Sequence, residues 1–193
     1  MGRVELGAQK KRRNRNIQRA VLMTVGAAGL IAVMAVAPNA LQLLKTTGIN
    51  ARLRYKAKTV LGKLKQKGEI EFIERDGRKY ARLTERGRQI FALTSEKMRI
   101  ADIRQKKWDR RYRLIIFDVP EKRKKIRERL RHEMKQSGFL RIQDSAWLYP
   151  HDCEEYIALL KANLHIGKDV LYAVVEQIEN DVWIRKQLNL PIN

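Results

Sequence analysis

The clearest helical pattern in the chain lies between residues 52 and 67. The apolar residues of this stretch recur mostly at steps of three or four and are Leu53, Ala57, Val60, Leu61 and Leu64. Lysine and arginine occupy most of the other positions, and Gly68 follows the stretch. This spacing predicts an amphipathic helix that buries its apolar stripe, exposes a basic face and ends at the glycine.

Two short runs after this helix predict a β-hairpin. Residues 69–74 and 79–83 are rich in β-forming side chains, and the residues between them are Arg75-Asp76-Gly77-Arg78. Asp-Gly between two such runs is a strong local hairpin signal, because both residues tolerate the positive φ angles of a tight turn. A helix capped by Thr84 is expected next.

Residues 20–44 carry no charged side chain, and three interpretations of them compete. A secretory signal would be cleaved after Ala35-Val36-Ala37, but Pro38 is a poor neighbour for cleavage. A membrane span needs about 18 apolar residues, and alanine and glycine dilute this stretch. We favour a buried helix that Pro38 ends and that restarts over residues 38–45, with small residues at 26–29 allowing close packing.

The back half alternates predicted strands and helices. Residues 112–120 predict a buried strand closed by a proline, and further strands are expected over 145–150 and 169–176. Helices are expected over 121–137 and 153–162. A short strand over 139–143 would complete the four strands of a ferredoxin-like α+β domain.

The charge of the chain points to a partner. Lys and Arg number 42 against 21 Asp and Glu, a net charge of +21. Residues 1–19 hold seven basic residues and one acid, residues 20–107 nineteen and seven, and residues 108–193 sixteen and thirteen. An ordinary small-molecule enzyme does not need this excess, so a polyanion is the expected partner of the front part.

The single cysteine, Cys153, excludes an intrachain disulfide and fits a reducing, cytoplasmic setting.

The order and charge of these elements predict an α+β protein in which a winged helix-turn-helix precedes a ferredoxin-like βαβ domain. The expected parts are a basic flexible arm over 1–19, the winged helix over 20–93, a connector over 94–107, a ferredoxin-like dimerisation domain over 108–181 and a tail or short helix over 182–193. In a winged helix the basic helix enters the major groove and the hairpin touches the DNA backbone. The expected DNA-binding residues are Arg52, Arg54, Lys56, Lys58, Lys63 and Lys67 on the helix and Arg75, Arg78 and Lys79 on the hairpin.

The back half also carries a family resemblance. The run from Trp108-Asp109 through Tyr112 to Val119-Pro120-Glu121 is similar to the strand that opens the second domain of the phenylacetate-degradation repressor (PaaX-type) family. The similarity continues through Gly138-Phe139 and residues 143–150, and pieces at 37–40 and 83–87 resemble the winged-helix half of this group. That second domain in turn resembles the small ferredoxin-like subunit of CRISPR adaptation, a dimeric metal-dependent nuclease or integration scaffold.

The resemblance implies two alternative functions. The first, which we favour, is a cytoplasmic regulator of transcription, a repressor, that binds double-stranded DNA as a homodimer and uses no cofactor. The second is a magnesium- or manganese-dependent nuclease or CRISPR-adaptation component, in which Asp118 occupies the place of the proposed metal ligand. One carboxylate per chain is a poor magnesium site unless a dimer brings two together. Asp118 would otherwise cap the helix that starts at Pro120.

Other chemistry and other partners are weakly indicated. His151 and Cys153 are close in sequence, but no further residues complete a zinc set. Attachment to a membrane through residues 20–44, with a cytoplasmic DNA-binding part, stays an alternative. The sequence identifies neither the operator nor a small-molecule inducer.

Overall fold

A computed structural model describes residues 17–29, 31–32, 51–103 and 107–192, with the backbone alone for residues 31–32 and 51–58. The chain divides into two compact units, residues 1–91 and 92–193. The boundary falls within helix α3, Glu85–Ile103.

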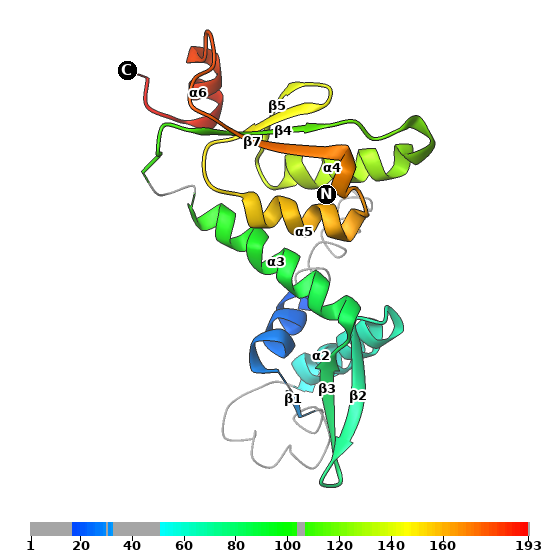
Figure 1. The fold of residues 1–193 in the computed structure, drawn as a ribbon. Coiled ribbons are helices and arrows are strands. Elements are labelled where there is room, and N and C mark those ends of the chain that lie inside the picture. Colours follow the sequence, from blue (N-terminus) through cyan, green and yellow to red (C-terminus); the bar gives the residue numbers. More distant parts are fainter. Residues whose placement is uncertain (1–16, 30, 33–50, 104–106, 193) are drawn as a thin grey trace, which may run out of the picture. The chain divides into compact units, whose positions relative to one another are not determined.

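The first unit combines helices with a small sheet (Figure 1). Its described elements are a helix over residues 17–28, strand β1 (Ile31–Ala32), helix α2 (Ala51–Gln66), strands β2 (Ile70–Arg75) and β3 (Arg78–Leu83), and the start of α3. The strands form an antiparallel sheet in the order β1-β3-β2. The predicted amphipathic helix and the predicted hairpin are both confirmed.

The ends of α2 and α3 show why the chain turns where it does. Gly68 adopts a φ of +68°, its N–H bonds the Lys65 carbonyl at 2.9 Å, and the Glu69 N–H bonds the Leu64 carbonyl at 2.9 Å. This pair of bonds is a Schellman motif, which satisfies the last carbonyls of the helix. The predicted cap of α3 is confirmed, because the Gly87 N–H donates to the Thr84 Oγ1 at 3.0 Å.

The core of the first unit lies between its helices and its sheet. Leu22 and Val25 of the first helix pack with apolar residues of α2, β2 and β3, namely Val60, Leu61, Leu64, Ile70, Ala81 and Leu83. A Cβ atom on Gly26 would lie 2.2 Å from the Phe91 ring, so only glycine lets the first helix approach α3 this closely. The expectation of close packing at this glycine is confirmed.

The structure corrects the prediction of one continuous helix from residue 20 to Pro38. The helix ends at residue 28, Gly29 follows with a φ of +70°, and Ile31 pairs with Ala81 of β3. A left-handed glycine ends helices readily, and a β-branched residue two positions later suits an edge strand. Within the described part of the chain, no helix is long and apolar enough to cross a membrane.

The middle helix of a winged helix-turn-helix is expected within residues 33–50, which lie outside the described residues. The predicted arm lies outside them as well, apart from residues 17–19, which belong to the first helix. The winged helix-turn-helix therefore stays a prediction.

The second unit is an α+β domain with a four-stranded antiparallel sheet in the order β5-β6-β4-β7. Its elements are β4 (Tyr112–Phe117), η3 (Glu121–Arg123), α4 (Lys124–Gln136), β5 (Leu140–Gln143), β6 (Ala146–Tyr149), α5 (Glu154–Leu164), η4 (Gly167–Asp169), β7 (Val170–Val175) and α6 (Val182–Leu188). This strand order and the βαββαβ succession are those of a ferredoxin-like fold. The short fourth strand is β5, as expected.

One face of this sheet is covered by α4 and α5, which run along it in Figure 1. The core includes Phe117 and Tyr149 from the sheet with Leu130 and Met134 from α4. Cys153 is fully buried here, and burial raises the pKa of its thiol to about 12. On the other face, α6 packs over Tyr112 and Leu148 through Ile184.

A buried arginine fixes the start of β4. Arg113 is 8% exposed, and its Nη1 and Nη2 donate to the two carboxylate oxygens of Asp109 at 2.8 and 2.7 Å. Further bonds run from Nη1 to the carbonyls of Arg111 and Pro150. The hydrogen bonds from Arg113 lower the pKa of Asp109.

Candidate nucleic-acid interface

The tip of the β2–β3 hairpin brings two predicted DNA-binding arginines together. Asp76 and Gly77 have φ angles of 49° and 65°, the signature of a two-residue type I′ turn. Arg75 and Arg78 are therefore direct cross-strand partners. Both are exposed, and neither has an acidic partner within the described residues. Like charges directly opposite each other destabilise a hairpin, so this pair does not serve the fold.

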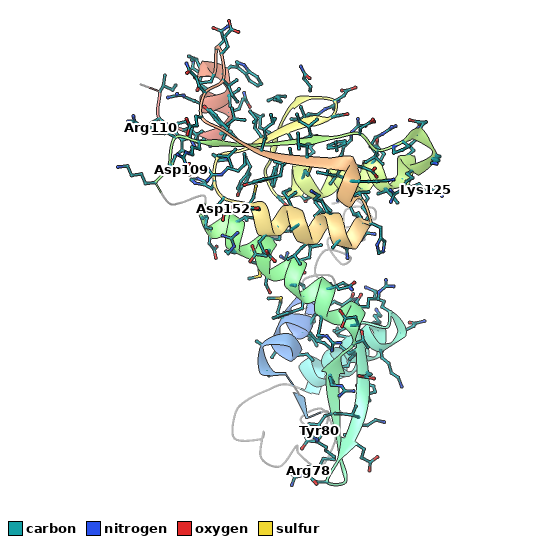
Figure 2. The ribbon with its side chains drawn as sticks, in the orientation of Figure 1. Arg78, Tyr80, Asp109, Arg110, Lys125 and Asp152 are labelled. Atoms are coloured by element: carbon teal, nitrogen blue, oxygen red, sulfur yellow. The ribbon has the colours of Figure 1, made fainter. Side chains whose placement is uncertain are left out.

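The two arginines share one face of the hairpin with an aromatic and an aliphatic residue. Counted in steps of two residues from the Arg75–Arg78 pair, the next cross-strand pairs on this face are Ile73 with Tyr80 and Glu71 with Arg82. Figure 2 shows Arg78 near the tip and Tyr80 further along β3. Arg82 differs from the tip arginines because its Nη2 lies 2.8 Å from the Glu71 carboxylate. This hairpin face thus ends in two cations that no carboxylate of the described chain neutralises.

A cation–π cluster joins α2 to the hairpin. The Nζ of Lys79 lies 5.5 Å from the centre of the Phe72 ring, and the Nζ of Lys65 lies 5.2 Å from it. Both ammonium groups are exposed and held on one ring, which is favourable for a cation. Lys65 and Phe72 were absent from the predicted site, because helical spacing places Lys65 on the basic face but does not show that it meets the hairpin.

The six DNA-binding residues predicted on the basic helix fall into three groups. Lys63 is exposed and has no acidic partner within the described chain. Lys67, just beyond α2, is engaged inside the unit, with its Nζ 2.8 Å from the Gln18 Oε1 and 4.0 Å from the Glu69 carboxylate. The side chains of the other four predicted residues, on the first turns of α2, lie outside the described residues: Arg52, Arg54, Lys56 and Lys58.

The candidate metal residue Asp118 follows β4 and is exposed. Its N–H donates to the Asp169 carbonyl at 2.9 Å, while the Asp169 carboxylate pairs with Arg123 at 2.9 Å. In the part of the chain that the structure describes, no three His, Cys, Asp or Glu side chains gather as a metal-binding group. The expectation that Asp118 caps the following helix is wrong, because η3 and α4 have no side-chain cap and Pro120 precedes η3.

An apolar patch lies on the sheet face opposite α4 and α5. Ile116 of β4 and Leu171 of β7 are direct cross-strand partners, and they are 40% and 60% exposed. Ala146 of β6 pairs with Ile116 on its other side. α6 packs over Tyr112 at the opposite end of β4, so this patch is the less covered end of the face.

A family comparison matches the second unit. Residues 105–184 match the family model described as the PaaX protein central Cas2-like domain. No curated protein matches the chain significantly. The match confirms the resemblance expected for the ferredoxin-like part, and it covers β4 to β7 together with the start of α6.

Proposed function

We propose that this chain, a PaaX-type protein by its Cas2-like residues 105–184, is a dimeric regulator of transcription that binds double-stranded DNA. The first unit would bind the duplex as a winged helix, with α2 as its recognition helix and the β2–β3 hairpin as its wing. The observation that carries the proposal is the pairing of Arg75 with Arg78 at the exposed tip, where repulsion opposes folding and a phosphate would relieve it.

The charge distribution supports a contact with the DNA backbone. Residues 20–107 hold nineteen basic residues and seven acids. Lys79 and Lys65 are held on Phe72, on the hairpin face opposite Arg75 and Arg78, so α2 and the hairpin both contribute cations to the first unit. If about six residues neutralise phosphates, log K for duplex DNA falls against log salt with a slope of roughly −5.

The direct test is duplex binding at several salt concentrations with the full chain. The double variant R75A/R78A removes two candidate contacts, so the slope should weaken by about 1.8 and affinity at 0.1 M salt should fall on the order of 60-fold. The matched control is R82A/R88A, which removes two arginines of the same unit that already pair with Glu71 and Glu85. A chain whose duplex binding does not depend on salt, or a tip variant no weaker than the control, contradicts the proposed interface.

The exposed sheet patch is the proposed dimer contact. Ile116 and Leu171 are large apolar side chains on the face that α6 leaves open, and a second copy can cover them about a two-fold axis. A dimer also suits a regulator that reads two half-sites of an operator.

Sedimentation of the full chain tests this contact. Leu171→Glu should shift the dimer to monomer, while Val182→Glu, on α6 and 50% exposed, should leave it dimeric. An unchanged chain that sediments as a monomer at micromolar concentration contradicts the proposed dimer.

A further inference from the structure

The positive charge of the second unit is concentrated on one segment. Residues 121–136, which form η3 and α4, hold eight Lys or Arg and three Glu. The rest of 108–193 holds eight basic residues and ten acids. The near-neutral total of this half therefore conceals one basic helix beside an acidic remainder.

The three glutamates of this segment are already paired. Arg127 lies 2.6 Å from Glu121, Arg131 lies 2.8 Å from Glu128, and Lys97 of α3 lies 2.8 Å from Glu133. Among the other cations of the segment, Arg123 pairs with Asp169, and Lys124 is 3.9 Å from Glu121. Those left without an acidic partner in the described chain form a set that we call the α4 row, and its members are Lys122, Lys125, Arg129 and Lys135.

The α4 row lies on the solvent side of the helix. Its members follow one another at steps of three, four and six residues, and all four are exposed. Leu130 and Met134 occupy the buried side. Figure 2 labels Lys125 at the periphery of the second unit. At about 1.5 Å per residue, the row extends over roughly 20 Å, a length suited to a partner with repeated negative charges rather than to one small anion.

The N-terminal end of α4 adds to the positive electrostatic potential of the α4 row. Lys122 and Lys125 stand near the positive end of the helix dipole. The first turn of α4 holds no acidic residue, and Glu121 of η3 is already paired with Arg127 and Lys124. No side chain caps η3 or α4. Cations at this end oppose helix stability, so the fold gains nothing from them, whereas an anion outside the helix is attracted by the cations and by the dipole together.

We propose that the α4 row is a second DNA-backbone contact, made by the PaaX-type domain in addition to the contact of the first unit. This inference rests on the proposed function, because it requires a chain that binds duplex DNA. Four further phosphate contacts would steepen the salt slope from roughly −5 to about −9. Because phosphate contacts carry no base information, the row should strengthen binding equally for different sequences.

The test compares three forms of the full chain on one duplex over a range of salt. In K122Q/K125Q/R129Q/K135Q the row loses its charge, and the slope should weaken by 3 to 4, from about 0.9 per contact. In K122R/K125R/R129K/K135R the charge stays, and the slope should match that of the unchanged chain. A third variant, K107Q/K161Q/K168Q/K186Q, removes the same charge from elsewhere in the second unit and should change the slope by less than 1.

The outcomes separate the two proposals. A charge-free row whose slope equals that of the charge-retaining row overturns this inference and leaves the first-unit interface intact. An unchanged chain without salt-dependent duplex binding overturns both. Far-UV circular dichroism of the charge-free variant should show undiminished helix, because neutral residues at the start of α4 do not oppose the dipole; a variant that unfolds is replaced by single substitutions, each expected to weaken the slope by about 0.9.

Discussion

The two units use arginine in opposite ways. In the second unit, Arg113 is 8% exposed, and two of its nitrogens bond both oxygens of Asp109. In the first unit, Arg75 and Arg78 face each other in solvent with no acidic partner among the described residues. The first arrangement stabilises a fold and the second one opposes it. A count of positive charges treats them alike, so the partners of each guanidinium decide which residues are available to a ligand.

The largest effect that tests this contrast is expected on stability. Arg113→Ala removes a network of buried, charge-assisted hydrogen bonds and should lower the free energy of unfolding by about 2–3 kcal/mol. All three tryptophans belong to the second unit, so tryptophan fluorescence in urea follows that unit selectively. The matched variant Arg111→Ala, whose exposed side chain pairs with Glu176, should cost less than about 0.5 kcal/mol. Equal losses in the two variants would contradict the structural role of Arg113.

The next effect concerns the hairpin that holds the tip arginines. Gly77 has a φ of +65°, so Gly77→Val should destabilise the turn by about 1–2 kcal/mol and weaken duplex binding with it. Amide hydrogen exchange of β2 and β3 measures the change. Gly62→Ala is the control of opposite sign: it lies in α2 with open space around it and should add up to about 1 kcal/mol of stability. A valine variant with unchanged exchange would contradict the type I′ turn.

A smaller effect depends on pH. Because Arg113 lowers the pKa of Asp109, the stabilisation from this pair is fully present above the ordinary carboxyl pKa near 3.8 and is lost as pH falls through the lowered value. Asp109 is partly exposed, so Asp109→Asn should cost only about 0.5–1 kcal/mol at neutral pH. Urea unfolding of both proteins should give a difference that shrinks below about pH 4. A difference independent of pH would exclude ionisation of Asp109 as its cause.

The smallest effect is expected at Asp118. Its carboxylate belongs to no described cluster of metal-binding side chains, so Asp118→Ala should leave duplex affinity and the salt slope unchanged. Duplex cleavage with magnesium or manganese that the alanine variant loses would instead favour the nuclease alternative.

The sequence predicted elements best where a local signal specifies them. Asp76-Gly77 indicated the hairpin and Thr84 the cap of α3, and the structure contains both features. Pro120 indicated the end of the first strand of the second unit, and β4 ends three residues earlier, at Phe117. The prediction of one helix over the uncharged stretch from residue 20 is wrong, because a run of small apolar residues has no period that distinguishes a helix from a helix followed by a strand.

The candidate site was predictable only in part, because contacts between elements do not follow from spacing. Periodicity placed Lys63 and Lys65 on the outer side of α2, but only the fold shows that Lys65 meets Phe72 and that Lys67 bonds Gln18. In the back half, a charge total hid the α4 row, since the acids that neutralise the other cations come from several elements. Asp169 of η4, for example, neutralises Arg123.

Cys153 makes opening of the second unit's core measurable by thiol labelling. Its thiol is fully buried and its pKa is raised to about 12, so at about pH 8 only on the order of one molecule in ten thousand carries the reactive thiolate. Because no other thiol competes in the chain, alkylation at this atom requires the ferredoxin-like core to open. The rate at which a thiol reagent labels the folded protein therefore measures how often that core opens, with no added probe and no denaturant.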